Sequence, residues 1–214
     1  MMSKLILIMG ESGSGKTTSM RNLDPKSTFY IDCDKKGLSW KGWRKQYNTE
    51  NKNYWASSDA DLITKQILKI SEKNKEVKTI IIDTINGILI DDEFKRMREK
   101  GYDKWMDMAY SVRGLIAMAM QLRDDITVIF TGHTQTERDD SGFMFTRLKT
   151  SGKKLDKIVL ESMFTTVLYS KCDDGKYSFE TQSKNSTAKS PMGAFETFEI
   201  PNDVVEVIKA LEEF

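Results

Sequence analysis

Short apolar runs alternate with amphipathic stretches over the first two-thirds of the 214-residue chain. Two stretches, residues 59–73 and 104–123, carry apolar side chains at helical spacing, and a shorter helix is expected over 16–22. The apolar runs have the continuous character of strands buried on both faces, and they are residues 5–9, 28–31, 79–82 and 126–131. This alternation predicts an α/β fold in which helices cover both faces of a mainly parallel sheet.

The pattern changes after about residue 133. Residues 134–157 are polar and lack a clear period, which predicts a long loop or a β-ribbon followed by the start of a helix. A terminal helix and three strand-like runs follow, over residues 203–213 and over 164–169, 177–181 and 195–200. We therefore predict a single domain over residues 1–214, with a core of residues 1–135 and a region of loops and antiparallel edge strands over 136–214.

The composition excludes several classes of protein. There are 33 Lys and Arg residues against 32 Asp and Glu residues, so the net charge of +1 excludes a polybasic binder, and any nucleic-acid affinity must come from a local basic surface. Cys33, Cys172 and the single His133 are too few for a zinc or His-rich metal site. Two cysteines and the lack of a long apolar run predict a cytoplasmic protein without a membrane span.

A glycine-rich loop after the first strand matches the motif G-x-x-x-x-G-K-[ST]. Its glycines allow backbone N–H groups to turn inward around phosphate oxygens, Lys16 reaches the β- and γ-phosphates, and Thr17 offers a hydroxyl to Mg²⁺. We predict that ATP and Mg²⁺ bind here, at Gly10, Glu11, Ser12, Gly13, Ser14, Gly15, Lys16, Thr17 and the adjacent Thr18.

Asp83 follows the apolar run of residues 79–82. Ligands of parallel sheets bind at the carboxyl ends of the strands, so this carboxylate is expected beside the phosphate loop, where it would hold Mg²⁺ through water. Thr84 would orient it. The alternative is a capping residue that begins the next turn.

Three further polar residues follow strands and are candidates for the chemistry. Asp34 is favoured as the carboxylate that activates the attacking water, and Asp32 as a supporting group of the metal site, because strand alternation would place both on one side. His133 is expected to end its strand and to sense the γ-phosphate. The alternatives are two loop-capping acids and a histidine that caps the strand.

Together these elements resemble the RecA-like ATPase core over residues 1–135. Asp34 falls where that family has a catalytic acid, normally glutamate, and His133 falls where it has a γ-phosphate sensor, often glutamine. Within that group the chain looks most like the short phage nucleotide-binding proteins, on the segments 82–84, 104–113 and 130–133. Some of these are RecA-like single-strand annealing proteins, so the resemblance implies ATP-dependent binding or annealing of single-stranded DNA in phage recombination or replication, beside a phage single-strand-binding protein.

RecA-like cores hold DNA in loops after the third and fourth strands, here about residues 86–103 and 134–157. The second loop interleaves cations with aromatic side chains, which suits stacking on unpaired bases. The candidate DNA-binding residues are Arg138, Phe143, Arg147, Lys149, Lys153 and Lys154. The alternative is a solvated hairpin, because acidic residues dilute the charge. A rival basic patch, residues 35–47, contains Trp40 and Trp43, which could instead pack on the core.

RecA-like enzymes commonly complete the site with a cation from a neighbouring subunit. Lys184 and Lys189 are candidates for this role, which would make the protein a homo-oligomer. Two other functions stay open. One is a nucleoside or nucleotide kinase, although residues 138–157 lack an Arg-rich lid. The other is a nucleotide switch that binds a protein partner without hydrolysis.

Overall fold

The computed structural model describes residues 2–101, 103–138, 141–150 and 159–214. Its strands are β1 (Lys4–Gly10), β2 (Thr28–Asp32), β3 (Tyr54–Ala56), β4 (Thr79–Asp83), β5 (Thr127–Arg138), β6 (Met144–Leu148), β7 (Thr166–Asp173), β8 (Lys176–Glu180) and β9 (Glu199–Pro201). Its helices are α1 (Trp43–Gln46), α2 (Ala60–Lys73), α3 (Ile85–Lys95), α4 (Asp103–Ala119) and α5 (Val204–Ala210), with 3₁₀ turns η1 (Thr18–Met20) and η2 (Leu160–Met163). None of the helices in these described ranges is long and apolar enough to cross a membrane.

The strands form one sheet in the order β3-β2-β4-β5-β1-β7-β8-β9, with β6 paired to β5 outside this order. Neighbours from β3 to β7 are parallel, whereas β6, β8 and β9 run antiparallel to their partners. This arrangement confirms the predicted α/β fold, with antiparallel strands added near the C-terminus.

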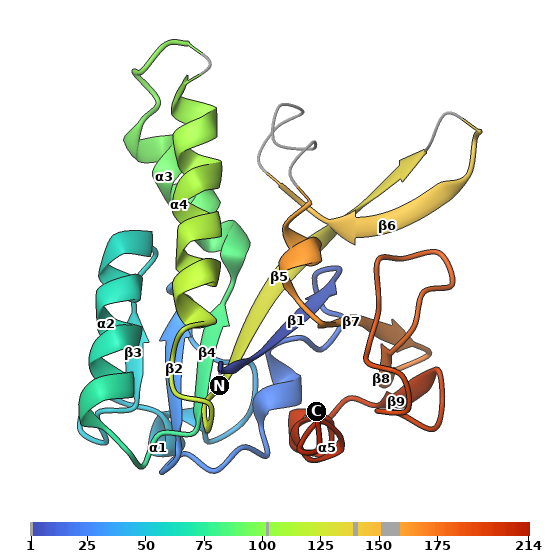
Figure 1. Cartoon of the computed structure of the whole chain (residues 1–214), viewed down its shortest axis with the longest axis horizontal. Helices are drawn as coiled ribbons and strands as arrows, with labels where there is room; N and C mark the ends of the chain where they lie inside the picture. Colours follow the sequence, from blue (N-terminus) through green and yellow to red (C-terminus); the bar gives the residue numbers. More distant parts are fainter. Residues whose placement is uncertain (1, 102, 139–140, 151–158) are drawn as a thin grey trace.

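Strand alternation divides the apolar side chains between two cores, one on each face of the sheet. Ile80 and Ile82 pack with α2, α3 and α4, which stand together in Figure 1. Ile81 faces the other way, toward η1 and α5. Continuous apolar runs were therefore the correct signal for strands buried on both faces.

The helix expected over residues 16–22 is much shorter in the structure. A single turn forms, in which the Ser19 N–H donates to the Gly15 carbonyl at 2.9 Å, and η1 ends at Met20. The Ser19 hydroxyl donates to the Lys16 carbonyl at 2.6 Å, a local bond that competes with helix propagation. Pro25 disfavours helical backbone at the residue before it, so the chain turns toward β2 instead.

The prediction of a loop over residues 86–103 is wrong for residues 86–95, because these residues form most of α3. Thr84 caps this helix, and its hydroxyl oxygen accepts a hydrogen bond from the Gly87 N–H at 3.0 Å. Exposed apolar side chains such as Ile90 and Phe94 blur the helical pattern of this segment. The three-residue strand β3 was also not predicted.

Two hairpins project from the edge of the sheet where the parallel strands end (Figure 1). One is α3 with α4. The other, here called the β-arm, is formed by residues 134–138 of β5 and by β6. The β-ribbon alternative for residues 134–157 is therefore confirmed for residues 134–138 and 144–148, whereas residues 139–140 and 151–158 lie outside the described ranges.

Close packing at Gly87 leads to a first prediction. A Cβ atom there would lie 2.5 Å from the Asp34 Oδ1 atom and 2.8 Å from the Cys33 carbonyl oxygen. We expect Gly87→Ala to lower the free energy of unfolding by about 1–3 kcal/mol through overpacking. A Cβ atom at Gly114 on α4 would have open space around it, so Gly114→Ala should raise the free energy of unfolding by about 0.5–1 kcal/mol through helix propensity. Urea unfolding measures the free energy of both variants, and changes of the same sign would contradict the close packing at Gly87.

Candidate nucleotide-binding site

The phosphate loop joins β1 to η1 and is shaped by its glycines. Gly13 and Gly15 have φ values of +80° and +95°, in the left-handed region that favours glycine. The Lys16 ammonium group is buried and donates to the carbonyls of Gly10 and Glu11 at 2.8 and 2.7 Å. Burial lowers the pKa of Lys16 to about 8, although the Asp83 carboxylate opposes this shift. The loop thus holds a buried cation among inward-turning backbone groups.

Residues from the C-terminal half support this loop from outside, although no motif in the sequence indicates them. The Ser170 hydroxyl donates to the Ser14 carbonyl at 2.7 Å. A Cβ atom at Gly15 would come within 2.7 Å of the Tyr177 ring, so glycine is required there by close approach as well as by φ. The Glu11 side chain accepts a hydrogen bond from the Thr134 hydroxyl at 2.8 Å, which ties the loop to β5.

Asp83 ends β4 directly beside the phosphate loop, as predicted. Its Oδ2 atom accepts hydrogen bonds from the Thr17 hydroxyl at 2.9 Å and from the Tyr30 hydroxyl at 2.6 Å. The Thr131 hydroxyl donates to its Oδ1 atom. Tyr30 and Thr131 belong to no motif in the sequence, because only the order of β2, β4 and β5 brings them to this carboxylate.

The donor set suits Mg²⁺. Within the described ranges no three His, Cys, Asp or Glu side chains gather into a metal cage. Thr17 and Asp83 instead provide one hydroxyl and one carboxylate side by side, and Mg²⁺ in nucleotide sites is held by few protein oxygens plus the phosphates. These two residues would hold the ion.

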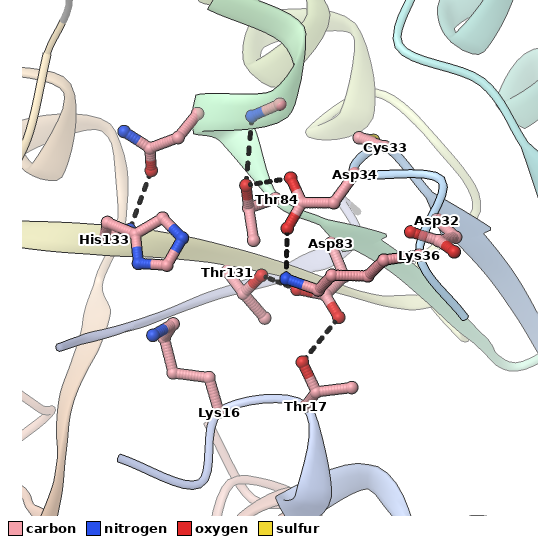
Figure 2. A network of polar contacts seen from close by, with 12 residues as sticks. Lys16, Thr17, Asp32, Cys33, Asp34, Lys36, Asp83, Thr84, Thr131 and His133 are labelled. Carbon is pink, nitrogen blue, oxygen red and sulfur yellow. Dashed lines mark hydrogen bonds and ion pairs between the residues drawn. The ribbon is translucent and has the colours of Figure 1, made fainter. Parts of the chain in front are cut away.

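Asp34 and Asp32 have different surroundings. Asp34 accepts a hydrogen bond from the Thr84 hydroxyl at 2.9 Å and pairs with Lys36 at 2.5 Å (Figure 2). Asp32 instead accepts from the Gly37 N–H and the Tyr54 hydroxyl, both at 2.7 Å. The expectation that Asp32 supports the metal site is therefore not met. Strand β2 ends at Asp32, so the alternation that would align the two acids does not continue.

His133 lies opposite Gly10 in the pairing of β5 with β1 and does not end its strand, which continues to Arg138. Its backbone N–H donates to Asn86 Oδ1 at 2.7 Å, and the Asn86 amide donates to the Lys149 carbonyl at 2.8 Å. Burial, followed by the nearby charge of Lys16, lowers the pKa of His133, which favours the neutral ring at pH 7. Asn86, which also belongs to no motif in the sequence, joins the two strands at the base of the β-arm.

The predicted site residues thus converge from four separate segments of the chain. Figure 2 shows Lys16 and Thr17 of the phosphate loop facing Asp83, with Asp34 and His133 close by. A family model described as an AAA domain matches residues 2–192. The chain belongs to the AAA-domain family. This AAA domain therefore brings its phosphate loop, the Thr17–Asp83 pair and the candidate acid Asp34 together in one P-loop ATPase fold.

Other comparisons are less informative. No curated protein matches this AAA domain. A solved structure similar to it is a KaiC-like protein from the hyperthermophilic archaeon Pyrococcus horikoshii. The two share 14% sequence identity with a TM-score of 0.45, over 82% of this chain and 76% of that chain.

The candidate DNA-binding residues of the AAA domain are only partly on the surface. Arg138 and Lys149 are exposed, and Phe143 is 51% exposed on the β-arm. Arg147 is only 7% exposed and lies 3.5 Å from the Glu137 carboxylate, so it differs from the surface residue expected. It occupies the inward side of β6 near the base of the β-arm. Lys153 and Lys154 lie outside the described ranges.

In the rival basic patch, residues 35–47, the two tryptophans pack on the core, which is the alternative stated for them above. Trp40 and Trp43 lie half-buried against the second core, and the Trp40 indole donates to the Gln46 side chain at 2.7 Å. Only the short helix α1 forms there. The patch therefore contributes aromatic packing rather than two free stacking surfaces.

The two candidate cations for a neighbouring site lie in the loop after β8. Lys184 is exposed. Lys189 is half-buried, and its backbone N–H and carbonyl pair with Val167 at 2.9 and 2.8 Å. The same loop runs beside β6, because the Thr146 N–H donates to the Asn185 carbonyl at 2.8 Å. A role in a second subunit stays a prediction for both lysines.

Tyr30 supplies a second prediction. Its hydroxyl is buried against Asp83, so Tyr30→Phe should lower the free energy of unfolding by about 1.5–3 kcal/mol. It should also weaken Mg²⁺-dependent nucleotide binding, because Asp83 loses a donor that orients it. Tyr54→Phe is the matched control, since that hydroxyl donates to Asp32. Calorimetric titration with and without Mg²⁺ measures the affinity, and equal losses in both variants would contradict the role of Tyr30.

Proposed function

We propose that this AAA domain is a Mg²⁺-dependent ATPase that acts on single-stranded DNA. One observation carries the ATPase part. The hydroxyl of Thr17 lies 2.9 Å from the carboxylate of Asp83, next to a buried lysine in a glycine cradle. These are the groups that phosphoryl transfer from a nucleoside triphosphate requires, because its catalysis consists mainly of positioning and charge stabilisation.

Each residue has a distinct task in this proposal. Lys16 neutralises the β- and γ-phosphates, while Thr17 and Asp83 hold Mg²⁺, which offsets phosphate charge when bound. Asp34 orients water for attack on the γ-phosphorus and accepts its proton, as the bond to the bridging oxygen breaks to give ADP and phosphate. His133, neutral and beside Lys16, contacts the γ-phosphate. Through Asn86 and Thr134, the same strand connects this region to the β-arm.

The β-arm supports the DNA part of the proposal. Directly before β6 lies the partly exposed Phe143, near Arg138, which pairs with Met144. The exposed Lys149 follows the other end of β6, and an aromatic side chain with cations along one ribbon suits the stacking of unpaired bases and contact with their backbone. The α3–α4 hairpin projects from the same edge of the sheet (Figure 1). It adds two exposed rings, Phe94 on α3 and Tyr110 on α4. Bases could stack on either projection while the backbone meets the cations.

The resemblance to phage annealing proteins supplies the biological setting. On that basis we place the activity in phage recombination or replication in the host cytoplasm, beside a phage single-strand-binding protein. A homo-oligomer in which Lys184 or Lys189 reaches a neighbouring site is the form that the resemblance favours.

Binding of a labelled oligothymidylate, followed by fluorescence anisotropy, tests the DNA part. We expect binding in the presence of Mg²⁺ and ATPγS, and we expect Phe143→Ala to weaken it by about 1–3 kcal/mol through lost stacking. Lys149→Ala should reduce the slope of log affinity against log salt by about 0.7. Phe198→Ala is the control, because Phe198 is 64% exposed beside β9, away from the β-arm. No binding, or equal effects of the two phenylalanine variants, would contradict the DNA assignment.

A further inference from the structure

The cation paired with Asp34 comes from the same loop of the same chain. Lys36 Nζ lies 2.5 Å from the Asp34 Oδ2 atom, while the Thr84 hydroxyl donates to Oδ1 at 2.9 Å. Both oxygens of the candidate water-activating carboxylate are therefore engaged by neighbouring side chains. A water molecule that hydrogen-bonds to the Asp34 Oδ2 atom must therefore displace the ammonium group of Lys36.

The backbone of the loop directs Lys36 inward. Lys35 and Gly37 both have positive φ values, 57° and 80°, and the Gly37 N–H is fixed to Asp32 at 2.7 Å. Within this tight turn the two adjacent lysines diverge. Lys35 reaches outward to Asp91 on α3 at 3.8 Å, whereas Lys36 reaches Asp34.

Lys36 shares the space above the phosphate loop with Lys16. Figure 2 shows its ammonium group on the side of Asp34 that faces Lys16 and Thr17. The positive charge of Lys36 acts electrostatically on the ammonium group of Lys16 and on the ring of His133. Two ammonium groups that repel each other across one space form a site for a polyanion, because a bound anion relieves the repulsion.

We propose that Lys36 is a phosphate-binding residue that acts in cis. On binding of a nucleoside triphosphate it leaves Asp34, contacts the γ-phosphate, and frees Asp34 to hold the attacking water. The side chain of Lys36 is 55% exposed and flexible, so this movement needs no backbone change. This inference rests on the proposed ATPase function. It assigns to Lys36 the stabilisation of phosphate charge for which Lys184 and Lys189 of a neighbouring subunit were the candidates.

The test compares Lys36→Ala and Lys36→Arg with Lys35→Ala. Because ADP lacks the γ-phosphate, Lys36→Ala should reduce the preference for ATPγS over ADP about tenfold, as expected for one lost charge-assisted contact. Turnover at saturating ATP should fall about a hundredfold, the effect of removing one donor to the developing charge. Lys36→Arg should recover part of the binding preference and part of the turnover, and Lys35→Ala should match the wild type in both quantities. A purely structural role for Lys36 would leave the ATPγS-to-ADP preference unchanged.

Several results would overturn the assignment. An unchanged preference in Lys36→Ala would exclude contact with the γ-phosphate, and a rise in turnover would show that Lys36 only blocks Asp34. Recovery of activity on mixing Lys36→Ala with Lys16→Ala would place the lysine in a neighbouring site instead. If the wild type hydrolyses no ATP, the proposed function fails, but the binding preference still decides whether Lys36 contacts the γ-phosphate.

Discussion

ATP turnover in the Lys16→Ala variant is expected to fall about a thousandfold, within the range lost when a major charge-stabilising group is removed. Lys16 is the buried cation of the phosphate loop, and the small side chain leaves the β- and γ-phosphates without it. The fold should survive, because among the described residues the lost side chain donates only to the carbonyls of Gly10 and Glu11. Turnover is measured by steady-state phosphate release, and stability by urea unfolding.

Lys4, at the start of the strand β1 that leads into the phosphate loop, provides a matched control. Its ammonium group also donates to two carbonyls, those of Leu211 and Glu212, at 2.6 and 2.8 Å. Lys4→Ala should therefore affect stability in a similar way while leaving turnover close to that of the wild type. Comparable turnover in the two variants would contradict the assignment of Lys16.

The second large effect is expected for Asp83→Asn. The amide keeps the shape of the side chain but removes the charge. In the wild type the hydroxyls of Thr17 and Tyr30 donate to the carboxylate, whereas an NH₂ group in its place cannot accept a hydrogen bond from them. We expect turnover to fall at least about a hundredfold, the Mg²⁺ concentration for half-maximal turnover to rise, and the free energy of unfolding to fall by about 1–3 kcal/mol. A magnesium titration of phosphate release measures the first two.

Asp32→Asn is the control for this prediction. Asp32 pairs in register with Asp83 on the neighbouring strand, is similarly buried, and accepts two hydrogen bonds where Asp83 accepts three. Its substitution should cost similar stability without a change in Mg²⁺ dependence. An identical Mg²⁺ dependence of the two variants would mean that Asp83 does not hold the ion.

The sequence predicted the parts of the site that depend on local spacing. The motif of residues 10–17 and an acid after a buried strand are read within one segment each, and the structure places Thr17 and Asp83 in contact. Tyr30, Thr131 and Asn86 could not be predicted in the same way. Their roles depend on which strands are neighbours, and that order is set by packing of the whole sheet.

Errors arose where a local pattern stopped early or depended on pairing. Strand β2 ends one residue before Cys33, so Asp32 and Asp34 do not share a side. The helix after the phosphate loop is limited by local side-chain bonds and by Pro25. Arg147 was assigned to the surface because the register of the β-arm, which places it near Glu137, is not evident from composition.

Phosphate release from Mg²⁺-ATP by the wild-type chain, with and without single-stranded DNA, tests the central claim most directly. The Lys16→Ala variant, prepared in parallel, measures any contaminating activity. We predict steady release by the wild type, faster release when single-stranded DNA is added, and almost none from Lys16→Ala in either condition. Wild-type release no higher than that of Lys16→Ala, with and without DNA, would contradict the assignment of this chain as an ATPase.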